Sequence, residues 1–331
     1  MYGLNSVPFK GGQPDCRTRT PKIEVVASCI NPTPAALETE GVDGRLWDAP
    51  AALRVWHVAS LDAPTVALVW SCAFAWVGGV RVPAWAPGVL ALIAWAVYIG
   101  DRLLDARAGM RSPPLHLLRE RHQFHWRHRW ILAPAGLAAA LAAAGLVFTR
   151  LPADACAPDM AVAAATLAYF SGLHSRGKMW HVVERRFAPF LSRPFVVGVL
   201  FTAGCLLPAA SQIPLVAATS FAEFLTVPAL FFAALAWLNC YAIEQWESAS
   251  WRSAQTRVAR MGGLFAAVGV VLAFVLVPYA PRAAWLVAAG SASGLLFIIL
   301  DRIRPRLTPV ALRAAADLVL LTPVIVLVLA R

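Results

Sequence analysis

Residues 87–109 read PGVLALIAWAVYIGDRLLDARAG. A helix needs about 20 apolar residues to cross the hydrocarbon core of a bilayer, and this stretch is apolar until it reaches Asp101 and Asp105. The pattern predicts a membrane-spanning helix over 86–104 with two acids at its end. Because side chains four residues apart lie on one face of a helix, both carboxylates are placed to hold one divalent cation. Ion pairs with neighbouring arginines are the alternative interpretation of these acids.

The whole chain shares this apolar character. Of its 331 residues, 59% are hydrophobic and 14% are charged, whereas soluble domains carry about a quarter charged residues. This composition excludes a soluble globular protein and predicts an all-α integral membrane protein with a nine-helix transmembrane bundle. The expected spans are 62–82, 86–104, 131–150, 158–175, 188–210, 219–243, 260–280, 283–300 and 309–330.

The first 61 residues differ from the rest of the chain. They are rich in Pro, Gly, Thr and charged residues and contain no apolar run long enough for the core of a signal peptide. We expect 1–61 to be a cytoplasmic extension and 62–331 to be the transmembrane domain. Residues 1–45 hold too little apolar surface to offset the entropy of ordering, which predicts disorder. The stretch 49–60 is expected to form a short helix at the membrane surface.

The distribution of charge predicts the orientation of the spans. Lys and Arg number 29 against 18 Asp and Glu, a formal net charge of +11. Most of the arginines fall in the loops after the second, fourth, sixth and eighth expected spans, and basic short loops favour the cytoplasmic side. The alternation predicts a multi-pass membrane protein with a cytoplasmic N-terminus, and the absence of organelle signals favours the bacterial inner membrane. The basic loops favour contact with anionic membrane lipids over nucleic-acid binding.

A second pair of acids ends the sixth expected span. The segment LNCYAIEQWESASWR at 238–252 places Glu244 and Glu247 three residues apart, with Asn239 and Tyr241 just before them. Both acidic helix ends are expected on the same side of the membrane. Two such pairs are able to clamp one diphosphate through bridging cations and so help a pyrophosphate leave. The alternative is a solvated helix end that pairs with Arg252.

Basic side chains that complement such a site follow the second and fourth spans. Arg102 adjoins Asp101, and Arg176 and Lys178 lie in YFSGLHSRGKMW at 169–180. Guanidinium and ammonium groups neutralise phosphate oxygens as charge develops on a leaving group. We expect these three side chains to steady a diphosphate, although basic residues are also expected in cytoplasmic loops for topology alone.

Aromatic and histidine residues add two further features. Tyr98, Tyr169 and Tyr241 are candidates to line a lipid pocket and to stabilise an allylic cation through their rings, although packing is the commoner role of such residues. The segment RHQFHWRHR at 121–129 repeats histidine every three residues. A metal site is one interpretation, but the interleaved arginines favour a basic segment that meets anionic headgroups.

Taken together, these features resemble the UbiA superfamily of intramembrane prenyltransferases. Members have nine transmembrane helices and two acidic motifs, N-D-x-x-D-x-x-x-D and D-x-x-x-D, that bind a prenyl diphosphate through magnesium. The run from Asp101 to Asp105 looks like the latter part of the first motif, and YAIEQWE at 241–247 resembles the family's Y-A-x-x-D segment. Val97 and Tyr98 stand where the first motif opens with Asn and Asp.

The resemblance implies a prenyltransferase that moves a polyprenyl group from a prenyl diphosphate to a lipophilic aromatic acceptor, with Mg²⁺ as cofactor. It assigns catalysis to Asp101, Asp105 and Lys178; substrate binding to Arg102, Arg176, Tyr98, Tyr169, Asn239 and Tyr241; and metal binding to Asp101, Asp105, Glu244 and Glu247. The alternative is a non-catalytic UbiA-like bundle that binds lipid or serves as a membrane partner. A secondary transporter ranks third. Such a protein is expected to carry charged or broken helices near the bilayer midplane, whereas the acids singled out here lie at helix ends.

Overall fold

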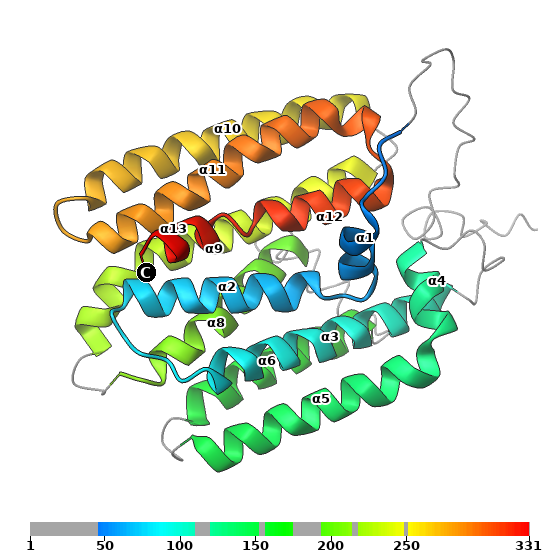
Figure 1. Cartoon of the computed structure of the whole chain (residues 1–331), viewed down its shortest axis with the longest axis horizontal. Coiled ribbons are helices and arrows are strands. Elements are labelled where there is room, and N and C mark those ends of the chain that lie inside the picture. Colours follow the sequence, from blue (N-terminus) through cyan, green and yellow to red (C-terminus); the bar gives the residue numbers. More distant parts are fainter. Residues whose placement is uncertain are drawn as a thin grey trace, which may run out of the picture. The chain divides into compact units, whose positions relative to one another are not determined.

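Long helices make up nearly all of the described chain (Figure 1). The structure is a computed structural model that describes residues 46–109, 120–151, 156–174, 193–213, 218–247 and 251–330. Across these ranges the one β-type pairing is an isolated bridge between Trp47 and Leu307. The predicted all-α class is therefore confirmed. The disorder predicted for 1–45 falls outside the described residues.

The helices follow the expected apolar runs closely. Each of the nine runs overlaps a described helix or, in the case of 309–330, a bent pair of helices. The elements are α1 (Ala51–Val58), α2 (Asp62–Val77), α3 (Trp85–Gly109), α4 (Glu120–Arg127), α5 (Arg129–Arg150), α6 (Cys156–His174), α8 (Arg193–Ala210), α9 (Ala218–Glu247), α10 (Trp251–Leu276), α11 (Pro281–Ile303), η4 (Arg304–Arg306), α12 (Pro309–Val319) and α13 (Pro323–Leu329).

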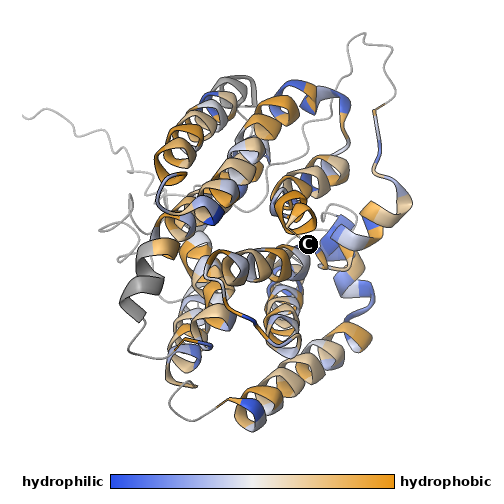
Figure 2. Cartoon of the chain, turned by 60° about the vertical axis from the view of Figure 1, so that its left-hand side comes forward, coloured by the Kyte–Doolittle hydropathy of each residue, from blue (hydrophilic) through white to orange (hydrophobic). Residues whose placement is uncertain are grey.

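Among the described residues, four stretches of helix are long and apolar enough to cross a membrane, and they lie in α5, α9, α10 and α11. Two bent pairs, α1 with α2 and α12 with α13, bring the number to six if each pair counts as one span. Figure 2 shows hydrophobic residues along the helices and hydrophilic residues gathered near their ends. Several apolar helices thus fit a multi-pass membrane protein, and the nine-helix arrangement stays a prediction.

The interior is built around α2. Trp70 of α2 stacks on Phe232 of α9 with ring centroids 3.8 Å apart, and its indole nitrogen donates a hydrogen bond of 2.8 Å to the carbonyl of Leu320. An indole N–H buried in an apolar core needs such an acceptor. These contacts hold α2 and α9 together and tie α2 to the end of α12.

The chain breaks sharply between α1 and α2, where the two helices meet at 88°. Ser60 lies in this turn with a φ of 58°, a left-handed conformation that L-residues adopt only at a cost. The Trp95 indole of α3 donates to the carbonyl of Ala59 at 3.1 Å. The helix predicted over 49–60 is confirmed as α1, and its position at the membrane surface stays a prediction.

Helix α4 packs against this turn through its histidines. His122 and His125 are both buried. The Nδ1 of His125 donates to the carbonyl of Arg121 at 2.8 Å, which leaves Nε2 to accept from the Ser60 hydroxyl at 3.3 Å. The headgroup contact predicted for the 121–129 segment therefore does not describe these two rings, because they face protein.

The second break separates α12 from α13, which are bent by 44°. Pro323 begins α13, and a proline lacks the N–H that would continue the helix from α12. At its other end, α12 is capped by Thr308, whose side-chain oxygen accepts from the backbone N–H of Ala311. Both breaks place the ends of short helices inside the bundle.

Candidate functional site

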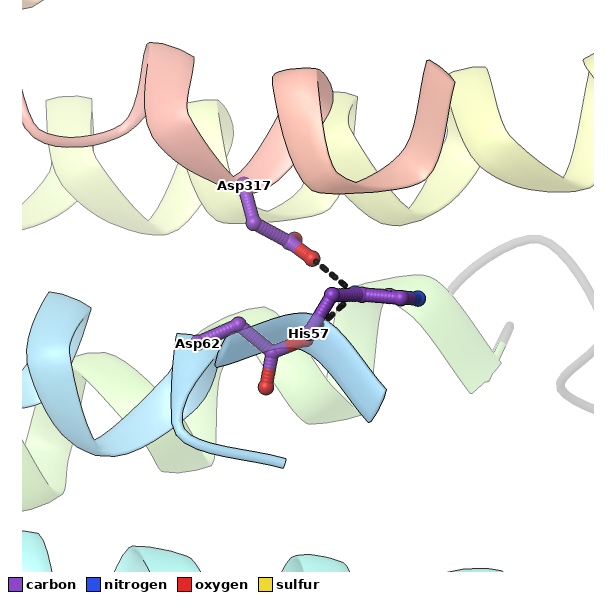
Figure 3. A group of neighbouring side chains, drawn as sticks. All are labelled: His57, Asp62 and Asp317. Carbon is purple, nitrogen blue, oxygen red and sulfur yellow. Dashed lines mark hydrogen bonds and ion pairs between the residues drawn. The ribbon is translucent and has the colours of Figure 1, made fainter. Parts of the chain in front are cut away.

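Three polar side chains from separate helices converge where these breaks meet (Figure 3). His57 comes from α1, Asp62 from α2 and Asp317 from α12. The Nδ1 atom of His57 lies 2.9 Å from Oδ2 of Asp62 and 3.5 Å from Oδ2 of Asp317. One ligand atom from each residue lies within 4.8 Å of the other two. The three groups therefore form one cluster.

The local backbone explains how the first two residues meet. The turn at Ser60 folds α1 across the end of α2, so that His57 lies over Asp62 although only five positions separate them. Asp62 begins α2, and its Oδ1 accepts from the backbone N–H of Ala63 at 2.9 Å. A carboxylate in the first turn of a helix also gains from the partial positive charge of that terminus.

Asn239 of α9 completes the cluster from the other side. Its Nδ2 donates a hydrogen bond of 3.0 Å to Oδ1 of Asp317. The residue is 7% exposed, and among the described residues its Oδ1 has no hydrogen-bond partner. An unsatisfied buried acceptor costs about 1–3 kcal/mol. The amide oxygen of Asn239 is therefore available to a ligand.

A cavity of about 40 Å³ lies beside the cluster. Its polar walls come from Asp62, Tyr98, Asn239 and Asp317, while α8 and the ends of α2 and α12 contribute apolar walls. A single water needs roughly 10–15 Å³ of such space. The cavity is thus large enough for an ion with water molecules.

The electrostatics of the cluster are unusual for a buried site. Asp62 is 3% exposed, and the Asp317 side chain is 16% exposed. Within the described ranges, no Lys or Arg forms an ion pair with either carboxylate, and His57 is the only basic group in contact with them. Buried carboxylates need a compensating charge. The arrangement is therefore suited to a proton or a small cation.

Some residues expected from the sequence lie at this site. Tyr98 of α3 and Asn239 of α9, both predicted to bind substrate, line the cavity. The guanidinium of Arg102 lies over the Tyr98 ring, 5.8 Å from its centroid. Three of the predicted residues are thus brought together, and they come from the two helices that carry the acidic motifs.

The two predicted acidic pairs are placed differently. Asp101 and Asp105 are half-buried near the end of α3, whereas Glu244 is exposed near the end of α9. Glu247 forms an ion pair with Arg313 of α12, and the side chain of Arg252, the partner expected in the alternative interpretation, lies outside the described residues. Figure 1 shows the C-terminal ends of α3 and α9 at the same end of the bundle, as the sequence predicts.

The remaining predicted residues lie away from the cluster or outside the described chain. Tyr241 stacks on Trp237 with centroids 5.4 Å apart, which fits the packing alternative. Tyr169 is half-buried on α6. Arg176 and Lys178 fall outside the described residues, so their predicted roles stay predictions.

Sequence reasoning missed His57, Asp62 and Asp317. The clearest available signal was Asp317, a lone acid inside the apolar run 309–330. An ionisable residue within a membrane segment is by default a candidate for function. His57 offered no such signal, because only the fold of the α1–α2 turn brings it beside two acids.

The chain was compared with protein families, curated proteins and solved structures. No family model, no curated protein and no solved structure matches the chain.

Proposed function

We propose that the protein is an intramembrane, magnesium-dependent prenyltransferase that resembles the UbiA superfamily. It would move a polyprenyl group from a prenyl diphosphate to a lipophilic aromatic acceptor. One observation carries the proposal: α3 and α9, the helices that carry the two predicted acidic pairs, contribute Tyr98 and Asn239 to the walls of one cavity. A site between these two helices is what the acidic motifs require.

The positions on α3 suggest how such a site would be divided. Asp101 follows Tyr98 by three residues, a rise of about 4.5 Å along the helix. The diphosphate would therefore bind toward the helix end, at the level of Asp101 and Asp105. Magnesium held by carboxylates would neutralise charge on the leaving diphosphate. Arg102, which lies against Tyr98, would support the same phosphate oxygens.

The contribution of the second acidic pair is smaller in this proposal. Glu247 is already paired with Arg313, so releasing it to a metal ion would leave a largely buried guanidinium without that partner. Glu244 is exposed near the end of α9. We therefore assign the metal-binding role chiefly to Asp101 and Asp105, with Glu244 in support.

The test is prenyl transfer by the purified full-length protein with a prenyl diphosphate, an aromatic acceptor and Mg²⁺. The Asp101→Asn and Asp105→Asn variants are expected to lose turnover at least about 100-fold, since each removes a charged metal ligand. Asp301→Asn is the matched control, because Asp301 is a buried aspartate of α11 that accepts a hydrogen bond from Trp246 and is not one of the predicted metal ligands. Unchanged turnover in both α3 variants would remove these acids from the mechanism.

A second candidate function, cation-coupled transport, is favoured by a different observation. Asp62 begins α2 directly after one helix break, and Asp317 lies two residues before α12 ends at the other. Interrupted helices that present ionisable groups are typical of secondary transporters. In sealed vesicles this function predicts ion flux that is lost in Asp317→Asn and retained in Asp101→Asn. Prenyl transfer predicts the opposite ranking of the two variants.

The non-catalytic alternative gives a third pattern. A UbiA-like lipid-binding protein would bind a prenyl diphosphate analogue without releasing diphosphate. Mg²⁺ would leave that binding unchanged, and neither aspartate variant would alter it.

A further inference from the structure

We propose that His57, Asp62 and Asp317, together with Asn239, form a binding site for one divalent transition-metal ion such as Zn²⁺ or Mn²⁺. This site is distinct from the magnesium site proposed at Asp101 and Asp105. It stands on different helices, and it does not depend on whether the protein transfers prenyl groups.

The charges of the cluster favour a bound metal ion. Two carboxylates are largely buried here, and no Lys or Arg among the described residues pairs with either of them. A protonated His57 would offset one negative charge and leave the other. A divalent cation beside a neutral imidazole would offset both, which is the condition for burying charged groups at tolerable cost.

The distances between the ligand atoms also favour a bound metal ion. Two ligand atoms at about 2.0–2.2 Å from a zinc ion lie roughly 3.3–3.5 Å apart when the coordination is tetrahedral. The His57 nitrogen already lies 2.9 Å and 3.5 Å from the two carboxylate oxygens. A metal ion would take the place of a proton held by these groups. The three ligand atoms lie within 4.8 Å of one another, so side-chain movements would bring them to this spacing.

The amide oxygen of Asn239 supports the site independently of the charged side chains. The Oδ1 atom of Asn239 is buried and has no hydrogen-bond partner within the described chain, and Asn239 lines the cavity into which the two carboxylates face. Its amide nitrogen is held by Asp317, so the amide orientation is fixed. A neutral oxygen presented in this way is a fourth ligand, and the cavity of about 40 Å³ leaves room for a water as a fifth.

The ligand set selects the class of metal. Carboxylate, amide and water oxygens suit Mg²⁺, Ca²⁺ and Mn²⁺, whereas imidazole suits Zn²⁺ and its transition-metal neighbours. Mg²⁺ also demands near-ideal octahedral geometry from oxygen ligands, and one ligand of this set is an imidazole nitrogen. We therefore expect Zn²⁺ or Mn²⁺ to bind in preference to Mg²⁺.

The test is direct metal binding to the chelator-treated, full-length protein in detergent. Co²⁺ serves as the spectroscopic probe, and Zn²⁺, Mn²⁺ and Mg²⁺ are then added as competitors. We expect one Co²⁺ per chain, displaced by Zn²⁺ at about one equivalent and by Mg²⁺ only at a large excess. Asp62→Asn and Asp317→Asn should each weaken binding at least tenfold, and Asp301→Asn, the buried-aspartate control, should leave it unchanged.

Asn239→Ala keeps the test informative if the aspartate variants fail to fold. It changes no charge, and it should weaken Co²⁺ binding several-fold and shift the absorption bands through loss of one oxygen ligand. The proposal is overturned if the wild type binds no Co²⁺ or Zn²⁺ at micromolar concentrations, since the cluster would then hold a proton only. Equal competition by Mg²⁺, or equal binding by wild type and Asp317→Asn, would overturn it as well.

Discussion

Two regions of the bundle are packed in opposite ways. One is the hairpin of α10 and α11, and the other is the junction of α1, α2 and α12. In the hairpin, Gly262 and Gly294 let the two backbones approach so closely that a Cβ on Gly294 would lie 2.7 Å from the Gly262 carbonyl oxygen. At the junction, two helices are broken and a histidine lies between two acids. At the glycine contact the hairpin packs backbone against backbone, whereas the junction gathers three ionisable side chains.

The difference separates stability from chemistry. Small residues stabilise a helix pair through van der Waals contact, which lipid tails do not disrupt. Buried ionisable groups contribute little net stability and mark sites of function within membranes. We therefore assign the hairpin to holding the bundle together and the junction to the proposed transition-metal site. Three measurements would test or refine this contrast.

The largest effect is expected at the junction. His57→Ala leaves two buried carboxylates without their basic partner, and removing one member of a buried pair costs about 3–5 kcal/mol. The free energy of unfolding in metal-free detergent should fall by that order. Adding Asp62→Asn to the same chain removes one of the uncompensated charges and should restore part of the loss. A His57→Ala variant as stable as wild type would show that the cluster carries no buried charge.

A smaller effect is expected at the hairpin. Gly294→Ala would push a methyl group into the backbone of α10, and such overpacking typically costs about 1–3 kcal/mol. Gly145→Ala on α5 is the matched control, because its Cβ would meet nothing within 4 Å and alanine favours the helix by about 1 kcal/mol. Thermal unfolding of the two variants should therefore shift in opposite directions. Equal shifts would contradict the close packing of α10 and α11.

The smallest effect is expected from His125, which links α4 to the junction. Burial lowers the pKa of His125 below its ordinary value of 6.5, so the folded state keeps the ring neutral while the unfolded state takes up a proton. Its contribution to stability is therefore fully present above about pH 6.5 and is lost as the pH falls from there toward the lowered pKa. A matched pH series of unfolding temperatures should fall less steeply in His125→Gln than in wild type. Identical slopes would show that His125 is not a source of acid sensitivity.

Periodicity and composition explain why much of the fold was predictable. The apolar runs predicted every long helix among the described residues. A helix forms its backbone hydrogen bonds within one segment, which a membrane-spanning segment requires in lipid unless it belongs to a closed barrel. Tyr98, Arg102 and Asn239 were chosen for their places beside acidic motifs, and the structure brings them to one cavity wall or against it. Their shared location follows from helix position alone.

The cluster itself was beyond such reasoning. The sequence shows Asp317 as an isolated acid, and it shows His57 in a short amphipathic segment. The sequence does not predict a contact between two residues that are 260 positions apart. This contact depends on a left-handed turn at Ser60 and on how α12 packs beside α2. The pairing of Glu247 with Arg313 was missed for the same reason.

By itself, the sequence determined that this chain forms apolar helices, which of them end in acids, and which side of each helix carries those acids. These properties are local, since they follow from side-chain transfer energies and the 3.6-residue repeat. The tertiary structure alone decided which ionisable groups meet. That choice depends on contacts between distant segments, where helix breaks and packing fix the distances and where burial turns ordinary side chains into a site.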